Sequence, residues 1–243
     1  MLSPNRSTIF SQLQADIVRL QRLGLHNNTG LDTGLDFMRE AFPNRSFPLG
    51  AVHEFLSVQA EDAAATSGFV SGLISSMMKA KGTGMWISSS RSVFPPALKM
   101  LGIPPERFVF LDLKNERDVL WATDEALKCG ALTAVVSELK HIDFTQSRRL
   151  QLAVEQSQST CFLLRQHVRN PGTTACVSRW KVSSLPSSVP DDLPGIGYPG
   201  WKIELLRIRN GVPGSWNVQW INGAFVSLDS NPVVTERKQK MLG

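Results

Sequence analysis

The most chemically suggestive stretch of the chain, FPLGAVHEFLSVQAEDAAATSGFVSG from Phe47, has the layout of a nucleotide-binding loop. A glycine turn precedes a β-branched apolar strand, a polar loop and a helix of small residues. A phosphate site at such a helix N-terminus needs free backbone N–H groups and a cation. This loop instead offers Glu61 and Asp62, and no Lys or Arg occurs between Arg45 and Lys79. The two carboxylates are expected to satisfy the helix dipole themselves, so the loop predicts a cap and no phosphate cradle.

Other side chains with catalytic or metal-binding chemistry lack the spacing that such chemistry needs. The G-x-S-x-G pattern of a nucleophile elbow is absent. The cysteines have no CxxC spacing and are expected to be small buried residues in a reducing cytosol: Cys129, Cys161 and Cys176. The histidines are scattered without ligand spacing: His26, His53, His141 and His167. His53 lies inside an apolar strand and is expected to be a core residue with its hydrogen bonds satisfied. Neither a metal nor a cofactor is predicted.

Length and composition indicate one α/β domain with small appendages. The chain has 243 residues, 42% of them hydrophobic, which is enough to bury a sizeable core. Its net charge of +5 predicts a weak attraction to polyanions and is too small for a dedicated nucleic-acid-binding tail. No signal-peptide pattern is visible, and no segment approaches the roughly 20 apolar residues of a membrane span. The protein is expected to be cytoplasmic.

The elements that would position these residues follow a regular order. Residues 1–24 predict an amphipathic helix, and residues 25–34 a polar linker. The helix carries an apolar stripe that is expected to contact either a partner protein or the chain's own core: Phe10, Leu13, Ile17 and Leu20. From residue 51 short apolar strands alternate with helices near residues 63–80, 95–101, 115–128 and 145–157. This alternation predicts a largely parallel twisted sheet flanked by helices.

The C-terminal part of the chain changes to strands without helices. The runs CVSRWKV, WKIELLRIRN and SWNVQWING predict three strands that extend the sheet antiparallel at one edge. The segment SSLPSSVPDDLPGIGYPG between the first two is expected to be a surface loop. The core domain is predicted to span residues 35–222. Residues 223–243 are polar and basic and are expected to form a flexible tail.

Taken in order, these pieces resemble the core of the RecA recombinase family and, more closely, the ImuA family of SulA/RecA-related accessory proteins. The resemblance covers about residues 33–222, and its most specific stretches are FPLGAVHEFL, ALKMLGIPPERFVFL, DVLWATDEALKCGALTAVVSEL, SRRLQLAVEQSQSTCFLLR and WKIELLRIRNGVPGSWNVQW. It implies a RecA-like fold with a degenerate nucleotide site.

The resemblance also assigns positions within that site. Asp62–Ala63–Ala64 stands where the RecA family has Gly-Lys-Thr, so the cation and the hydroxyl that holds Mg²⁺ are both replaced. Ser90 falls at the catalytic glutamate and cannot act as that base. Glu138 falls at the acidic end of the Walker B strand, and Gln166 at the nucleotide-sensing glutamine. Both are expected to be remnants or structural polar residues, and Glu138 to be a buried, paired carboxylate.

The DNA-binding loops of the RecA family are shortened here to LKHIDF and HVRNPGTT. Cations near them could touch phosphates or could belong to a solvated helix face and loop rim: Lys140, Arg148, Arg149 and Arg169, with His141, Arg165 and His167. Phe144 is the one aromatic residue beside them, which argues against a base-stacking platform and predicts weak or indirect DNA binding. Arg207 and Arg209 match two lysines that RecA extends toward its neighbour's ATP. They could cap a RecA filament, or they could be exposed charges on an edge strand.

The ImuA resemblance implies a non-catalytic adaptor of bacterial damage-induced (SOS) mutagenesis and translesion synthesis. The implied partners are an ImuB-like Y-family polymerase homologue, an error-prone replicative-type polymerase and RecA itself, with association to the nucleoid when these are engaged. A SulA-like inhibitor of cell division is the alternative from the same diverged core. A DNA-dependent ATPase is the third hypothesis, and Ala63 and Ser90 argue against it because they stand where the RecA family has its catalytic lysine and glutamate.

Overall fold

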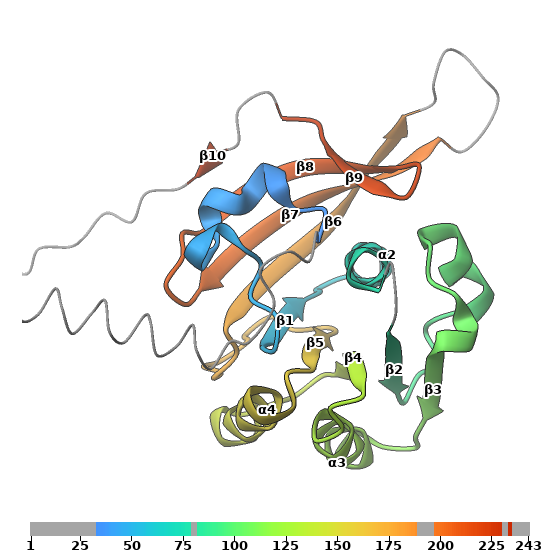
Figure 1. Cartoon of the computed structure of the whole chain (residues 1–243), viewed down its shortest axis with the longest axis vertical. Coiled ribbons are helices and arrows are strands. Elements are labelled where there is room, and N and C mark those ends of the chain that lie inside the picture. The colour runs from blue at the N-terminus through green and yellow to red at the C-terminus, as the bar shows by residue number, and fades with distance from the viewer. Residues whose placement is uncertain (1–32, 79–81, 189–196, 230–232, 235–243) are drawn as a thin grey trace, which may run out of the picture. The chain divides into compact units, whose positions relative to one another are not determined.

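The computed structural model describes residues 33–78, 82–188, 197–229 and 233–234, and its centre is one mixed β-sheet (Figure 1). The strand order is β10-β8-β7-β6-β1-β5-β4-β2-β3, and β9 pairs with β8. The strands are β1 (Val52–Leu56), β2 (Thr83–Ser88), β3 (Phe108–Asp112), β4 (Leu132–Leu139), β5 (Thr160–Arg165), β6 (Ser178–Ser188), β7 (Tyr198–Ile208), β8 (Gly214–Ile221), β9 (Ala224–Ser227) and β10 (Val233–Val234). The mostly parallel sheet predicted from the alternation of strands and helices is confirmed.

The pairing at the C-terminal end differs in one respect from the expectation. The first of the three late strands, β6, runs parallel to β1, with Phe55 opposite Trp180 in the register. Antiparallel pairing begins only between β6 and β7 and continues to β8 and β9. β1 lies between β5 and β6 and is parallel to both, so the segment from Gln166 to Val177 passes β1 and returns to the end of the sheet where β5 began before β6 starts.

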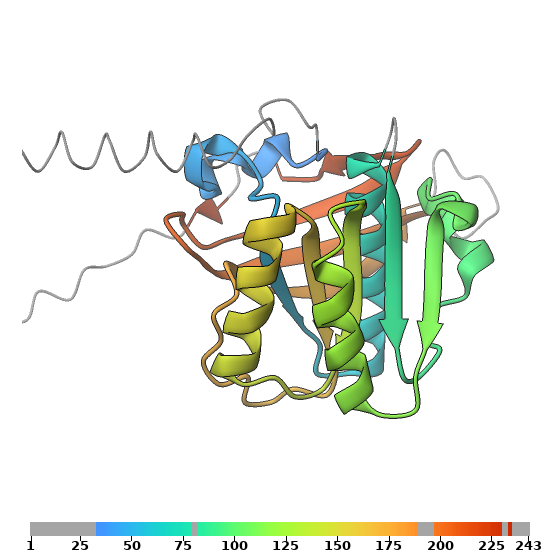
Figure 2. The same cartoon turned by 60° about the horizontal axis from the view of Figure 1, so that its bottom comes forward.

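Helices cover both faces of the parallel part of the sheet. The helix α2 (Ala60–Met77) lies on one face, and α3 (Glu116–Leu127) and α4 (Phe144–Ser157) lie on the other (Figures 1 and 2). The remaining helices are short 3₁₀ turns: η1 (Asp36–Ala41), η2 (Pro43–Arg45), η3 (Pro95–Leu101) and η4 (Pro105–Arg107). One buried apolar cluster surrounds α2 and a second lies under α3 and α4. Since α2 is enclosed on most sides, ten of its residues are buried.

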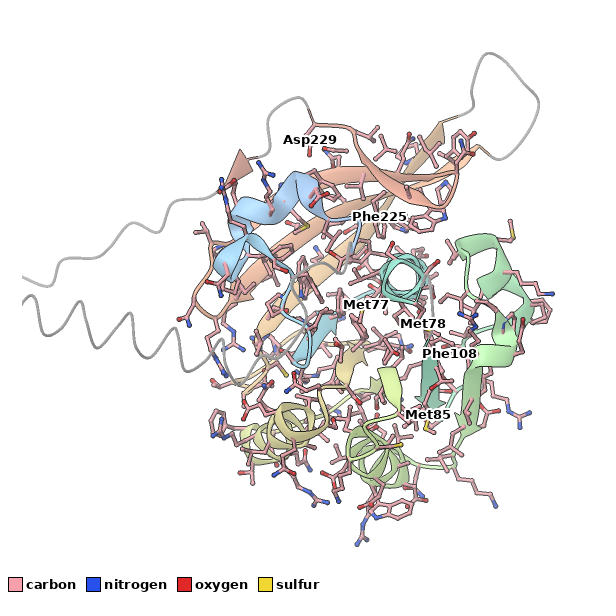
Figure 3. The ribbon with its side chains drawn as sticks, viewed as in Figure 1. Met77, Met78, Met85, Phe108, Phe225 and Asp229 are labelled. Carbon is pink, nitrogen blue, oxygen red and sulfur yellow. The ribbon has the colours of Figure 1, made fainter. Side chains whose placement is uncertain are left out.

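The core extends beyond residue 222, where the sequence analysis ended it. Strand β9 pairs with β8, and Phe225 packs in the α2 cluster with 8% of its surface exposed (Figure 3). A Cβ atom added at Gly72 would lie 2.9 Å from the Phe225 ring, so the helix and this ring are in close contact. The predicted tail therefore contributes at least one strand to the domain. The strand is only four residues long, but its backbone pairs with β8 and its one large aromatic side chain is buried.

The predicted surface loop between the first two late strands is also shorter than expected. β6 continues to Ser188 and β7 begins at Tyr198, so half of the Pro- and Ser-rich segment belongs to the hairpin strands. The predicted N-terminal helix with Phe10, Leu13, Ile17 and Leu20 and most of the basic tail lie outside the described residues. In the described part of the chain, no helix is long and apolar enough to cross a membrane.

Candidate functional site

The position of a phosphate loop, between β1 and α2, is occupied by a short and well-packed turn. Only residues 57–59 separate the strand from the helix. Asp62 turns back and accepts a hydrogen bond from the backbone N–H of Gln59 at 3.4 Å. Ser57 is buried, and its hydroxyl lies 3.1 Å from that of Thr66. The first turn of α2 is thus closed by the chain's own side chains, and a phosphate there would meet a carboxylate in place of a cation.

Three of the predicted site residues meet at one buried carboxylate. Glu138, at the end of β4, is 5% exposed and accepts hydrogen bonds at both oxygens. Trp86 donates through Nε1 at 2.8 Å to Oε1, and Ser92 donates to the same oxygen. Ser90 donates to Oε2 at 2.9 Å, and Gln166 donates to Oε2 at 3.4 Å. The partners of this carboxylate are neutral donors and not a cation, and the carboxylate holds the ends of β2, β4 and β5 together.

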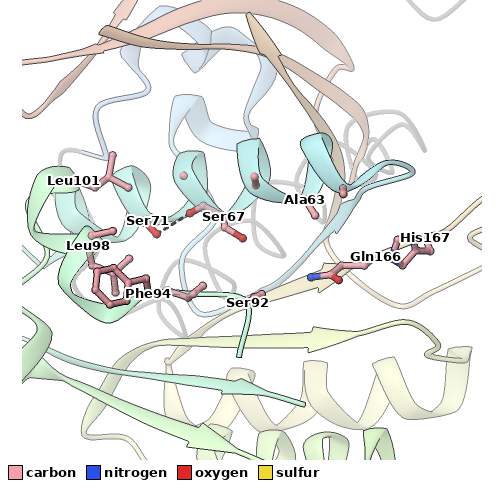
Figure 4. Close-up of a pocket in the computed structure, with 14 residues that line it drawn as sticks. Ala63, Ser67, Ser71, Ser92, Phe94, Leu98, Leu101, Gln166 and His167 are labelled. Carbon is pink, nitrogen blue, oxygen red and sulfur yellow. Dashed lines mark hydrogen bonds between the residues drawn. The ribbon is translucent and has the colours of Figure 1, made fainter. Parts of the chain in front are cut away.

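A cavity of about 430 Å³ lies between this cluster and the first turns of α2 (Figure 4). Small α2 side chains such as Ala63, Ala64 and Ser67 form one wall, and the segment from Ser92 to Leu101 forms the opposite wall. Gln166 and His167 close one end. Among the residues that the structure describes, no Lys, Arg, Asp or Glu lines the cavity. Such a lining suits an apolar or small neutral group and offers nothing to neutralise a nucleotide triphosphate.

Of the basic residues predicted to contact DNA, some are ion-paired within the protein and others are exposed. Arg149 donates to both carboxylate oxygens of Asp124, at 3.0 Å from Nε and 2.5 Å from Nη2, so its charge is balanced on the α3–α4 surface. Arg165 is buried and forms an ion pair with Glu54, which contradicts its inclusion among the exposed cations. The exposed cations that remain are Lys140, Arg148 and Arg169, with His141 and His167.

Sequence reasoning missed the cluster around Glu54, which we call the Glu54 cluster: Glu54, Arg165, Thr174 and Arg179. Glu54 is fully buried, and Arg179 donates to it through Nε at 2.7 Å while Thr174 donates at 3.0 Å. The two arginines also donate to the carbonyls of Pro171 and Gly172. The sequence contained a signal for part of this cluster, because Glu54 and Arg165 each lie in a run rich in apolar residues and a buried charge needs a partner.

Arg207 and Arg209 also hold this segment. Arg207 Nη2 donates to the carbonyls of Thr174 and Cys176 at 3.2 and 3.0 Å, and Arg209 Nη2 donates to that of Ala175 at 3.2 Å. β7 as a whole lies between β6 and β8, but its pairing with β8 ends at Leu205. Arg207 pairs with Arg179 of β6, and Arg209 lies one residue after β7 and is exposed. The segment from Pro171 to Cys176 is therefore fixed by four arginines.

Burial shifts the pKa of one histidine and two cysteines toward their neutral forms. His53 is a satisfied core residue, and burial lowers its pKa to about 4 despite a hydrogen bond to the Pro48 carbonyl. Burial raises the pKa of Cys176 to about 11, with Glu54 adding to the effect, and raises that of Cys161 as well. Neither thiol is a nucleophile at neutral pH. Cys129 is exposed, against the expectation of burial. Among the described residues, no group of three or more His, Cys, Asp or Glu could hold a metal ion.

Comparison with known proteins identifies relatives of this arrangement. No protein-family model matches the chain. The chain is 34% identical to Protein ImuA from two strains of Caulobacter vibrioides over 190 residues, which cover 73% of this chain and 78% of the relative. Among solved structures, the RadB recombinase is similar at a TM-score of 0.54 and 13% identity, covering 80% of this chain and 98% of that one.

A solved SulA structure from Pseudomonas aeruginosa is similar over 49% of this chain and 99% of that one, at 18% identity and a TM-score of 0.41, which is too low to support an argument. The RadB similarity agrees with a RecA-like fold, which the strand order and the placement of α2 show independently. The sequence identity to the two curated relatives extends over most of both chains. The chain therefore belongs to the ImuA family.

Proposed function

We propose that this protein is a non-catalytic accessory factor of bacterial damage-induced mutagenesis and translesion DNA synthesis. The observation that carries the proposal is the closed N-terminus of α2, where Asp62 caps the helix and the described part of the chain contributes no Lys, Arg, Asp or Glu to the adjoining cavity. A RecA-like domain without phosphate chemistry at this place is suited to binding and not to ATP hydrolysis. Membership of the ImuA family supplies the cellular process.

The proposed partners are an ImuB-like Y-family polymerase homologue and an error-prone replicative-type polymerase, met in the cytoplasm and at the nucleoid when they are engaged. The apolar stripe of residues 10–20 stays a predicted protein contact. Capping of a RecA filament through Arg207 and Arg209 also stays a prediction. In both arginines Nη2 donates to backbone carbonyls of the same chain. Each guanidinium has further N–H donors that a partner could use.

The ATP test uses thermal unfolding of the full chain with increasing Mg-ATP. A ligand present at about 100 times its Kd adds about 2.7 kcal/mol to the stability of the native state. We expect no shift of the melting temperature, because the phosphates would meet Asp62 without a compensating cation. A rise that saturates with ATP, or ATP hydrolysis stimulated by DNA, would show that the domain is an active nucleotide enzyme.

The partner test is co-purification with the ImuB-like protein encoded by the same bacterium. Ile17→Asp is expected to weaken that complex, because helical spacing places Ile17 on the apolar stripe. Ala15→Asp introduces the same charge on the opposite side of the predicted helix and serves as the matched control. Complexes of equal strength from both variants would remove the stripe from the interface, and a complex missing already in wild type would refute the adaptor role.

A further inference from the structure

A small cavity lies between α3 and α4, which run side by side on the face of the sheet opposite α2 (Figure 2). Leu120 and Trp121 line it from α3, and Gln146 and Leu150 line it from α4. We call this cavity and the side chains around it the α3–α4 groove. The cavity volume of about 220 Å³ is below the roughly 300–1,000 Å³ of a typical small-molecule site. A cavity of this size and lining suits one large apolar side chain of a protein.

Trp121 stands at this cavity with much of its indole in solvent. It is 63% exposed, whereas the other tryptophans of the chain are at most 4% exposed: Trp86, Trp180, Trp201, Trp216 and Trp220. Burying an indole removes a large apolar area from water, and tryptophan is enriched among the residues that dominate protein interfaces. A single exposed apolar residue needs no explanation by itself. Trp121 differs because a cavity adjoins it, so an incoming side chain would be enclosed by both.

A free cation lies one helical turn from Trp121. Arg117 precedes Trp121 by four residues, so the two side chains share one face of α3, and both line the cavity. In the described ranges, no hydrogen bond or ion pair joins Arg117 to another residue. Arg149, on the α4 side, is already paired with Asp124. Arg117 is therefore the charge of this groove that is left for a partner.

The acidic side chains of α3 and α4 do not meet this need. Each Asp and Glu on the two helices already accepts a hydrogen bond within the chain: Glu116, Asp118, Asp124, Glu125 and Glu155. A second copy of the same face would therefore bring Arg117 no uncommitted carboxylate. Charge complementarity favours a different protein that carries free carboxylates.

We propose that the α3–α4 groove binds an acidic amphipathic helix of a partner protein. One apolar side chain of that helix enters the cavity against Trp121, and a carboxylate one turn away pairs with Arg117. This arrangement matches the four-residue spacing of the two residues on α3 and the way in which amphipathic helices fill grooves. The groove lies on the opposite face of the sheet from α2, so its failure to bind would leave the accessory function proposed above intact.

The test uses the full chain and a helical peptide of about 15 residues with leucine on one face and glutamate on the other. Anisotropy of the fluorescein-labelled peptide measures binding, and acrylamide quenching of tryptophan emission, with unlabelled peptide, reports contact at the groove. Because Trp121 is the exposed tryptophan, it supplies most of the emission that acrylamide quenches. We expect saturable binding that protects this emission. Trp121→Ala without peptide should remove the quenchable emission, which assigns the signal.

Two variants and their matched controls locate the contact. Trp121→Ala should weaken binding about 30-fold, the effect of losing a central aromatic anchor, and Arg117→Glu about tenfold. The controls are Leu228→Ala and Lys99→Glu, which truncate an exposed apolar side chain and reverse an exposed charge away from the groove. Both controls should bind the peptide as wild type does. Each substituted side chain is exposed, so thermal unfolding should confirm that all four variants fold.

Altered peptides and competitors decide between this partner and other occupants. Peptides with serine in place of leucine, or lysine in place of glutamate, should not bind, and equal binding of either would overturn the proposal. Displacement by oligothymidylate at similar concentrations would assign the groove to polyanions in general. Protection of Trp121 that grows with protein concentration alone would assign it to a second copy. Absence of binding at about 1 mM peptide, or binding that leaves the quenching unchanged, would also overturn the site.

Discussion

The stability of this fold should fall when the pH drops from 7 to 5, because His53 is held in its neutral form. Its side chain is fully buried on β1. His53 Nε2–H donates to the carbonyl of Pro48 at 2.7 Å, so Nδ1 is the acceptor for the Ser178 hydroxyl at 2.6 Å. Trp180 Nε1–H in turn donates to the Ser178 oxygen at 2.5 Å. This chain of bonds fits a neutral imidazole, and a second ring proton would break it.

The size of the effect follows from the pKa difference. Burial lowers the pKa of His53 from 6.5 to about 4, while the hydrogen bond to Pro48 opposes the shift. The stabilising contribution is therefore complete above pH 6.5, where both states are neutral, and is lost as the pH falls toward 4, because the unfolded chain takes up the proton first. The full difference corresponds to about 3 kcal/mol, and about 2 kcal/mol of it should be lost by pH 5.

The assay is urea unfolding followed by tryptophan fluorescence at pH 7, 6 and 5. Wild type should lose stability across this range, whereas His53→Gln should be less stable at pH 7 but nearly independent of pH. His141→Gln removes an exposed histidine and should keep the wild-type dependence. Asp124 does not interfere with this assay. Burial raises its pKa, but Arg149 and Lys128 lower it more, so the stability that its ion pairs contribute is lost only below about pH 4. The reasoning is refuted if His53→Gln retains the wild-type slope.

Three further changes test the packing. Glu54→Gln should lower the free energy of unfolding by about 3–5 kcal/mol, because it leaves Arg165 and Arg179 without their shared buried carboxylate. Phe225→Ala should cost about 3–5 kcal/mol in the same urea assay if β9 belongs to the core, and a near-neutral result would return residues 223–229 to the tail. Arg169→Ala should change stability by less than about 0.5 kcal/mol, since its side chain is exposed.

The parts of the fold that the sequence predicts well are those set by local patterns. The five parallel strands and the helices between them follow from runs of apolar residues and their spacing, and α2 begins at Ala60, three residues before the predicted start. The sequence around the N-terminus of α2 contains no Lys or Arg, and this can be read directly because the residues that cap a helix are close to it in sequence. Glu138 could be assigned to a strand end for the same reason, but its four neutral donors come from two separate segments, residues 86–92 and Gln166.

The parts that the sequence did not predict depend on contacts between distant residues. Glu54 meets Arg165 and Arg179 at separations of 111 and 125 residues, so no local pattern pairs them. The parallel entry of β6 beside β1 depends on how the Gln166–Val177 segment crosses the sheet. β9 is too short to show an alternation, and Phe225 is recognisable as a core residue only when it lies against Gly72.

The Glu54 cluster connects the stability of the fold with the shape of the cavity lined by Arg148, Arg207 and Arg209. Glu54 and His53 are neighbours on β1 and point to opposite faces of the sheet, as alternation along a strand requires. His53 stacks on Phe47 and Phe162 in the α2 cluster, while Glu54 reaches Thr174 on the wall of the cationic cavity. On the α2 face the strand supports a cavity without charge, and on the other face it fixes a segment whose carbonyls orient Arg207 and Arg209. One face of the RecA-like sheet thus carries a cavity whose described lining has no Lys, Arg, Asp or Glu, while on the other face the buried carboxylate of Glu54 keeps a cavity lined by arginines in a defined shape.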